Sequence, residues 1–557
     1  PKPAPANAEF RVDGSVPAAA ILLENHLLSH SVGIKLDPAT SRGTIAANVT
    51  LNMPLGRTLP KNSVHYAVNA VLSSFGADKT LMGEKLEAST LKVAASSGGS
   101  YSVKGNVKIN GMPATLDVDK KSAATAADLE LDARLDEGDR RKLGMDFGDA
   151  VRGTVPVKLT GKLDDDAQKP TTFALDADLT RARIEGLLPG WNKASGQPAH
   201  LTAKMTKGPD GERFDDLALS GSGVAVRGNI ALDKNGHLAS ADFPVFGLSH
   251  GDRASLKAVR SSDGVLHVTM RGDVYDGRSI IKTSLFGHSS EKSGSDTTDI
   301  DLDVKIGTVV GHNGETLRGL DLKLNRRDGY IRNFVMHAKI GRDATLLGDL
   351  RLRARDNHRV IYIESGDAGA LFRFADMYSR VYGGSMWVAM DPPTPDHAPQ
   401  VGILFVRDFS VRGEKGLDQV VAGAPNEARD GVPFSEMHAE FTRFPGKMAV
   451  RNGVVRGPLV GATISGQINY TRDDVHLRGT FVPFYGINNM FGQIPIVGLV
   501  LGGGSNEGLL GINYEAVGRI GSPQILVNPV SAIAPGLLRK FVPSPGDFDP
   551  NFIPPSR

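Results

Sequence analysis

The chain of 557 residues contains no cysteine. This absence excludes disulfide frameworks, zinc-thiolate sites, iron–sulfur clusters and thiol catalysis. A large excess of one charge is missing too, because 64 Lys and Arg residues face 62 Asp and Glu residues. With a formal charge of +2 there is no electrostatic footprint for nucleic acid, so we expect no nucleic-acid partner. A large chain without thiols suits an oxidising compartment.

Apolar side chains are present in quantity. Hydrophobic residues make up 40% of the chain and charged residues 23%, a balance that excludes wholesale disorder. The sequence begins at Pro1 rather than Met, so we interpret it as lacking an N-terminal segment of the intact protein. A signal or membrane anchor would lie in that segment.

Period-two alternation is the dominant pattern. Ile300–Ile306 and Leu320–Asn325 each place aliphatic residues on one side and polar residues on the other, as does Ile464–Tyr470. Successive side chains of a strand point to opposite faces, so these strands have one apolar and one polar face. Asn-Gly and Asp-Gly pairs between such runs predict hairpin turns. They are Asn110-Gly111, Asn235-Gly236, Asp263-Gly264, Asp328-Gly329 and Asn452-Gly453.

Repetition and a shortage of helices complete the prediction of the fold. Four similar stretches each end in a glycine, at Gly105, Gly228, Gly348 and Gly466, with spacings of 118 to 123 residues. They indicate a serial array of like units, although chance alignment of β-rich sequence is an alternative. Helical patterns are restricted to Ala18–Ser31, Asp136–Phe147 and Asp367–Tyr382. We therefore predict a mainly β protein: a long, curled antiparallel sheet that forms an apolar groove of repeating units, with a few short helices.

Residues 479–506 contain no charged residue. The segment is long enough to span a membrane, but prolines and glycines divide it into pieces too short for an uninterrupted helix. A monotopic or lid-like apolar segment fits better, and a buried helical plug within the fold is the alternative. The membrane-facing or lid residues predicted here are Phe484, Tyr485, Met490, Phe491, Ile494, Ile496, Val497 and Leu499.

Catalytic motifs are weak. Gly247–Gly251 matches the G-x-S-x-G elbow around Ser249, and Asp263 and His267 follow in the order seen in hydrolases. The elbow needs a helix after the serine, whereas the residues that follow predict a hairpin. The 14 histidines have no metal-ligand spacing. We expect no enzyme activity, no cofactor and no metal, with an esterase using Ser249 or a β-rich glycan hydrolase as the alternative.

The C-terminal part of the chain resembles a known family. Gly479–Asn489, Ile494–Gly498 and Val527–Ser531 with Ala534–Gly536 are similar to the AsmA-like C-terminal region of large proteobacterial envelope proteins, of the YhdP and TamB type. Phe246–Asp252, Arg271–Gly277 and Ser365–Gly369 extend the resemblance upstream, so that it covers roughly residues 200 to 545. The resemblance implies a periplasmic protein, anchored in the inner membrane when intact, that moves phospholipids between the inner and outer membranes along a β-groove.

The alternation supports the same function independently. A sheet with one apolar face must cover it, and few helices are available, so phospholipid acyl chains would fill a curled apolar trough. We expect passive conduction, with contacts to both membranes through the missing anchor and the C-terminal apolar segment. The alternative is a periplasmic scaffold with a closed protein core and no lipid. The predicted groove-wall residues are Ile300, Leu302, Val304, Leu320, Leu322, Leu324, Ile464 and Ile468.

These patterns divide the chain into four parts. Residues 1–200 form the N-terminal part of the groove array, and residues 201–430 form its central units. Residues 431–545 form the AsmA-like C-terminal region, and residues 546–557 form a flexible tail.

Overall fold

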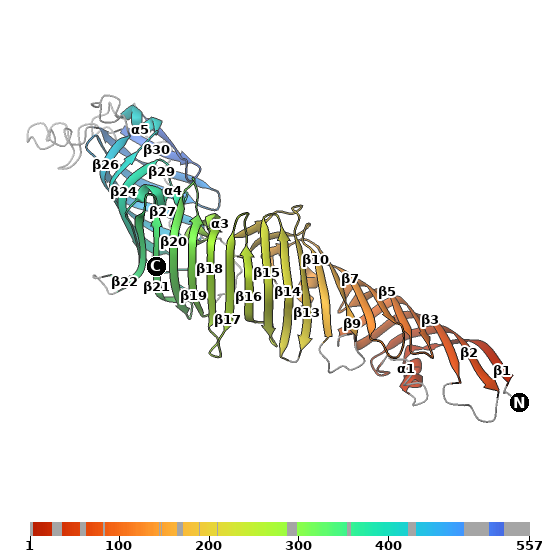
Figure 1. The fold of residues 1–557 in the computed structure, drawn as a ribbon. Coiled ribbons are helices and arrows are strands. Elements are labelled where there is room, and N and C mark those ends of the chain that lie inside the picture. Colours follow the sequence, from red (N-terminus) through yellow and green to blue (C-terminus); the bar gives the residue numbers. More distant parts are fainter. Residues whose placement is uncertain are drawn as a thin grey trace, which may run out of the picture. The chain divides into compact units, whose positions relative to one another are not determined.

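The computed structural model describes residues 4–24, 36–55, 63–81, 84–143, 145, 147–163, 171–188, 190–208, 210–286, 298–353, 358–420, 431–483 and 512–528. Within these ranges the predicted fold class is confirmed, because the chain is mainly β with few short helices (Figure 1). Of the described strands, 28 are assigned to one mixed sheet and three to a small second sheet. The chain divides into two compact units, residues 1–250 and 251–557.

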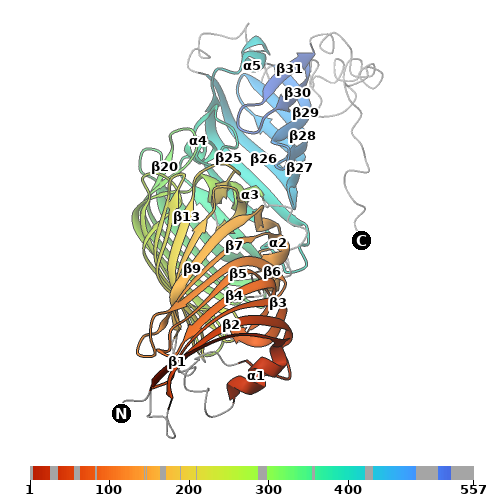
Figure 2. The same ribbon diagram turned by 90° about the vertical axis from the view of Figure 1, so that its right-hand side faces the viewer.

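In the first unit, strands that follow one another along the large sheet pair antiparallel. Figure 2 shows that its N-terminal strands bend strongly, so this part of the sheet is curled. The strands are β1 Ala4–Ser15, β2 Arg42–Leu55, β3 His65–Leu81, β4 Glu84–Ser96, β5 Tyr101–Ile109, β6 Met112–Lys120, β7 Ala127–Leu135, β9 Val155–Leu163, β10 Thr171–Asp178, β13 His200–Gly208, β14 Gly211–Gly221, β15 Val224–Asp233 and β16 Leu238–Gly247.

Short elements complete the first unit. Helix α1 (Val16–Glu24) buries Val16 and Ala20. Helix α2 (Glu137–Lys142) starts at a capping box made by Asp136 and Asp139. The 3-10 helix η1 (Gly148–Ala150) precedes the small sheet, whose strands lie in the order β12-β11-β8. These strands are β8 Val151–Arg152, β11 Arg183–Leu188 and β12 Trp191–Lys193.

In the second unit, successive strands again pair with one another, and every pair but one is antiparallel. The exception is the parallel pair of β18 with β19. A parallel pair needs a long crossover, and the one here contains helix α3 (Arg278–Phe286). The strands are β17 Arg253–Arg260, β18 Leu266–Asp276, β19 Ile300–Val310, β20 Thr316–Arg327, β21 Tyr330–Ile340, β22 Ala344–Leu352, β23 Arg359–Ser365, β24 Val381–Met390, β25 Gln400–Val411, β26 Val432–Phe444, β27 Lys447–Arg456, β28 Val460–Asn469, β29 Asp474–Pro483, β30 Ile512–Gly518 and β31 Gln524–Asn528. Helices α4 (Ala368–Phe374) and α5 (Lys415–Val420) lie between strands.

Four of the five predicted hairpin turns join consecutive strands. At Asn110-Gly111 both residues have positive φ (50° and 80°), as a type I′ turn requires. Asn452-Gly453 is the exception and lies inside β27, so that prediction is wrong. Only Asn452 has positive φ, and the register of β27 against β28 shifts between Val450 and Gly453. The pair therefore marks a bulge within a strand.

The four repeat glycines occupy equivalent positions. Each lies in the second strand of a hairpin, opposite an apolar residue of the first strand. The pairs are Leu91 with Gly105, Leu217 with Gly228, Met336 with Gly348, and Val450 with Gly466. The four stretches thus share a register, and a serial array of like units stays a prediction.

Candidate functional site

One face of the second unit's sheet is apolar. Across β19 and β20, Leu302 lies opposite Leu324 and Val304 lies opposite Leu322. Leu322 in turn lies opposite Met336 of β21. The strand register therefore puts on one face the residues that alternation assigned to one face. Their side chains form apolar rows across neighbouring strands.

The same face continues toward the C-terminus. The register carries it from Met336 through Gly348 and Ile363 to Val388 of β24. From there the partners lead through β25 to β27, where Met448 lies opposite Ile468 of β28. Ile464 is on the same side of β28 as Ile468. All eight predicted wall residues thus share one surface, here called the apolar face, and their contact with lipid stays a prediction.

Charged side chains occupy the reverse side of the same strands, here called the polar face. Lys305 forms an ion pair with Asp321 at 2.9 Å, and Arg327 forms one with Asp301 at 2.7 Å. The Arg327 guanidinium holds the pKa of Asp301 below its ordinary value, because it stabilises the charged carboxylate. The sheet is therefore two-faced, with charges paired on the polar face.

Burial on the apolar face changes along the strands. At one end Val309, Leu317, Ile340 and Leu346 are buried, with exposed fractions of 0–7%. Toward the other end most apolar side chains on this face are half-buried, although Ile361 is only 7% exposed. Of the eight predicted wall residues, Val304 is buried and seven are half-buried: Ile300, Leu302, Leu320, Leu322, Leu324, Ile464 and Ile468. The face is thus covered at one margin and partly open at the other.

Helix α4 covers the buried margin (Figure 2). Its Ala368 and Phe372 belong to a hydrophobic core with Met386, Val406 and Phe409. The helix is capped by Asp367, whose side chain accepts a hydrogen bond from the Ala370 N–H at 2.9 Å.

Close approach and ion pairing fix the position of α4. A Cβ at Gly311 would collide with the Phe374 ring, so glycine permits the contact. Arg373 forms an ion pair with Glu315 at 2.7 Å. These contacts bind α4 to the hairpin between β19 and β20.

The predicted lid residues, Phe484, Tyr485, Met490, Phe491, Ile494, Ile496, Val497 and Leu499, lie outside the described residues. The proposed lid therefore stays a prediction. Among the described residues, none of the helices has both the length and the apolar character needed to cross a bilayer.

The apolar side of the first unit is more closed. A core includes Leu91, Leu116, Leu129 and Phe173, each exposed by 2% or less. Val16 of α1 belongs to this core. In this unit the apolar side chains of the curled sheet pack largely against one another.

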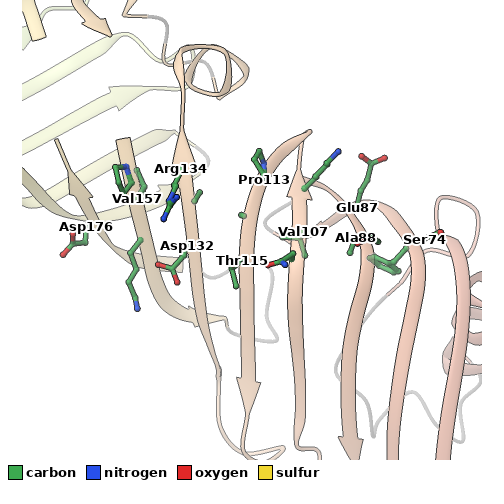
Figure 3. Close-up of a pocket in the computed structure, with 18 of the residues that line it drawn as sticks. Ser74, Glu87, Ala88, Val107, Pro113, Thr115, Asp132, Arg134, Val157 and Asp176 are labelled. Atoms are coloured by element: carbon green, nitrogen blue, oxygen red, sulfur yellow. Dashed lines mark hydrogen bonds between the residues drawn. The ribbon is translucent and has the colours of Figure 1, made fainter. Parts of the chain in front are cut away.

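The first unit also carries a cavity that sequence patterns did not indicate. It has a volume of about 940 Å³ and is lined by both acidic and basic side chains (Figure 3). Thr115, Asp132 and Asp176 lie in one row across the strands, connected through Lys158. This row is on the opposite face from Leu116 and Leu131. Phe75 and Val107 of this unit's core also line the cavity, so its wall is partly charged and partly apolar.

The serine elbow lacks its structural context. Strand β17 rather than a helix follows Ser249. Asp263 accepts hydrogen bonds from Ser261 and from the Val265 N–H, and His267 lies 3.3 Å from Asp301. Their recorded interactions therefore differ from those of a hydrolase triad. Among the described residues, no group of three or more His, Asp or Glu side chains is arranged to hold a metal ion.

No family model, curated protein or solved structure matches the chain.

Proposed function

We propose that the protein conducts phospholipids passively along the apolar face of its sheet. The observation that carries the proposal is the set of apolar rows that sequential strand pairing carries from β19 to β28 in the second unit, past local register shifts, with most of their side chains half-buried along one margin. An acyl chain placed there leaves water at a gain of about 0.8 kcal/mol per CH₂. Because neighbouring rows offer similar aliphatic contacts, a chain can move between them without a bond being made or broken.

The length of the sheet fits this task. The second unit has 15 strands that pair in sequence, from β17 to β31. The apolar face described above crosses ten of them, β19 to β28, so at about 4.8 Å per strand it would extend on the order of 50 Å. That length accommodates several lipids one after another.

The resemblance to the AsmA-like C-terminal region supports a proposed transfer in the bacterial envelope. On this proposal the protein lies in the periplasm, is anchored in the inner membrane, and exchanges lipid with both membranes. We propose no catalytic role, because the recorded interactions of Asp263 and His267 differ from those of a hydrolase triad.

A scaffold with a closed protein core is the second candidate. It is favoured by the first unit, where the core side chains cover one another, and by α4, which closes one margin in the second unit. A scaffold would bind envelope proteins and carry no lipid.

Native mass spectrometry of the full chain, purified from a bacterial host without added lipid, separates the two candidates. Conduction predicts mass increments of phospholipids that disappear on organic extraction. A bare protein mass after mild purification would contradict conduction and favour the scaffold.

A further inference from the structure

The open margin of the apolar face carries three arginines. Arg326 follows Leu322 and Leu324 on the same side of β20. Arg359 lies opposite Leu352 at the start of β23, and Arg443 lies opposite Gln400 at the end of β26. By register, all three belong to the apolar face and occupy the strand ends away from α4.

This placement differs from that of the other strand charges nearby. The carboxylates of β19 to β23 lie on the polar face: Asp301, Asp303, Asp321, Asp349 and Glu364. The lysines of β19 to β21, Lys305, Lys323 and Lys339, lie there as well. At this margin the charged residues on the apolar face are therefore arginines, whereas the acids and lysines named above lie on the polar face.

Local contacts hold the three side chains at the margin. Arg326 Nη2 donates to the Thr298 carbonyl at 3.0 Å, and Arg359 Nη1 donates to the Arg332 carbonyl at 3.2 Å. Arg443 Nη1 donates to Gln400 Oε1 at 3.0 Å. Burial lowers the pKa of Arg443, so its charge is carried in a partly desolvated setting.

The spacing of the arginines suits a row of anions. Strands β20, β23 and β26 are three strands apart, so neighbouring arginines lie about 14 Å apart across the sheet. A guanidinium offers a planar fork of donors that matches phosphate oxygens. An acyl chain on the half-buried rows would bring its glycerol end toward this margin.

We propose that Arg326, Arg359 and Arg443 form a phosphate-binding margin, which makes phosphate-bearing lipids the cargo class in preference to neutral lipids. The inference rests on the proposed function, because it needs acyl chains on the apolar face. The group that binds at this margin is the phosphate of a lipid whose acyl chains lie on the adjacent apolar face.

The test measures lipid uptake by the full chain. Protein is incubated with phosphatidylcholine vesicles that contain either fluorescent-acyl phosphatidylglycerol or fluorescent-acyl diacylglycerol, then separated from the vesicles, and its fluorescence is read. We expect uptake of phosphatidylglycerol to exceed that of diacylglycerol about tenfold, as one retained charge-assisted contact would give. The triple variant R326Q/R359Q/R443Q is expected to lose this preference by taking up less phosphatidylglycerol.

Two further variants keep the test decisive. K305Q/K323Q/K339Q removes the same charge from the polar face and is expected to keep the full preference. Arg359→Gln alone changes an exposed side chain, so it should fold normally and lower the preference about threefold. If circular dichroism shows that the triple variant is misfolded, the lipid preference of Arg359→Gln alone tests the proposal.

The outcomes separate the two proposals. Equal uptake of both lipids by the unaltered protein, or an unchanged preference in the folded arginine variants, would overturn the phosphate-binding margin and leave conduction intact. No uptake of either lipid would overturn conduction itself. Glycerophosphate, which has no acyl chains, is expected not to compete. Competition by it would show a site for free phosphate and contradict the assignment to lipid.

Discussion

Replacing two apolar-face leucines by aspartate should empty the protein of lipid without unfolding it. Leu302 and Leu322 are half-buried and lie in adjacent rows of β19 and β20. Each leucine offers an acyl chain about 1.5 kcal/mol of apolar contact, so the double variant loses about 3 kcal/mol. This corresponds to about a 100-fold lower affinity. Lipid binding would also require the two new carboxylates to lose water, which lowers the affinity further.

The assay is phospholipid per protein, measured by extraction and mass spectrometry, with circular dichroism as the check on folding. Lys339→Asp is the control, since it changes the net charge by the same amount on the polar face. Lys339 is exposed and lies opposite Arg318 and Thr345, so the new carboxylate meets no acidic partner there. If the folded leucine variant retains as much lipid as the control, the apolar face does not bind the chains.

Three further predictions concern the second unit. Trp387→Ala should destabilise it by about 2 to 3 kcal/mol in chemical denaturation, because the indole is half-buried and stacks between Tyr362 and Phe405 at centroid distances of 5.9 and 5.6 Å. Gly311→Leu should lower the melting temperature in a thermal melt, at a cost of about 1 to 3 kcal/mol, because the new side chain would displace the Phe374 ring of α4. Asp301→Asn should flatten the acid limb of the stability curve. The folded pKa of this carboxylate is lowered, so its contribution of about 1 kcal/mol exists at neutral pH and is lost as pH falls below about 4, and an equally steep limb in the variant would contradict the ion pair.

Strand faces could be predicted from sequence because pairing in this chain is sequential. Where two alternating runs form a hairpin, as β19 and β20 do, parity within each run fixes which side chains meet across them. Leu302 and Leu324 were assigned to one wall on this basis, and the register places them opposite each other. The same argument could have extended the row to Arg326, which continues the parity of Leu324.

Other features depend on contacts distant in sequence. The Asn452-Gly453 pair looks like a turn, but the Asn452 side chain donates to Glu440 Oε2 at 3.0 Å and the strand continues past it. The cover provided by α4 depends on Gly311, about 60 residues before Phe374, and no periodic pattern connects the two. Arg359 and Arg443 reach the apolar face only through the register of several strands.

The arginines at the open margin also bear on why the apolar face stays accessible. A half-buried apolar row in water favours closure, because each buried CH₂ contributes about 0.8 kcal/mol. In the first unit closure is more advanced, with Leu91 and Leu116 only 2% exposed. In the second unit, closing the open margin would bury Arg326 and Arg443 further, and burying a charge more deeply costs free energy. On this reasoning the same guanidinium groups that select phosphate would keep the margin hydrated. Replacing them by methionine should therefore reduce binding of an uncharged hydrophobic dye such as Nile red, whereas lysine should leave it unchanged.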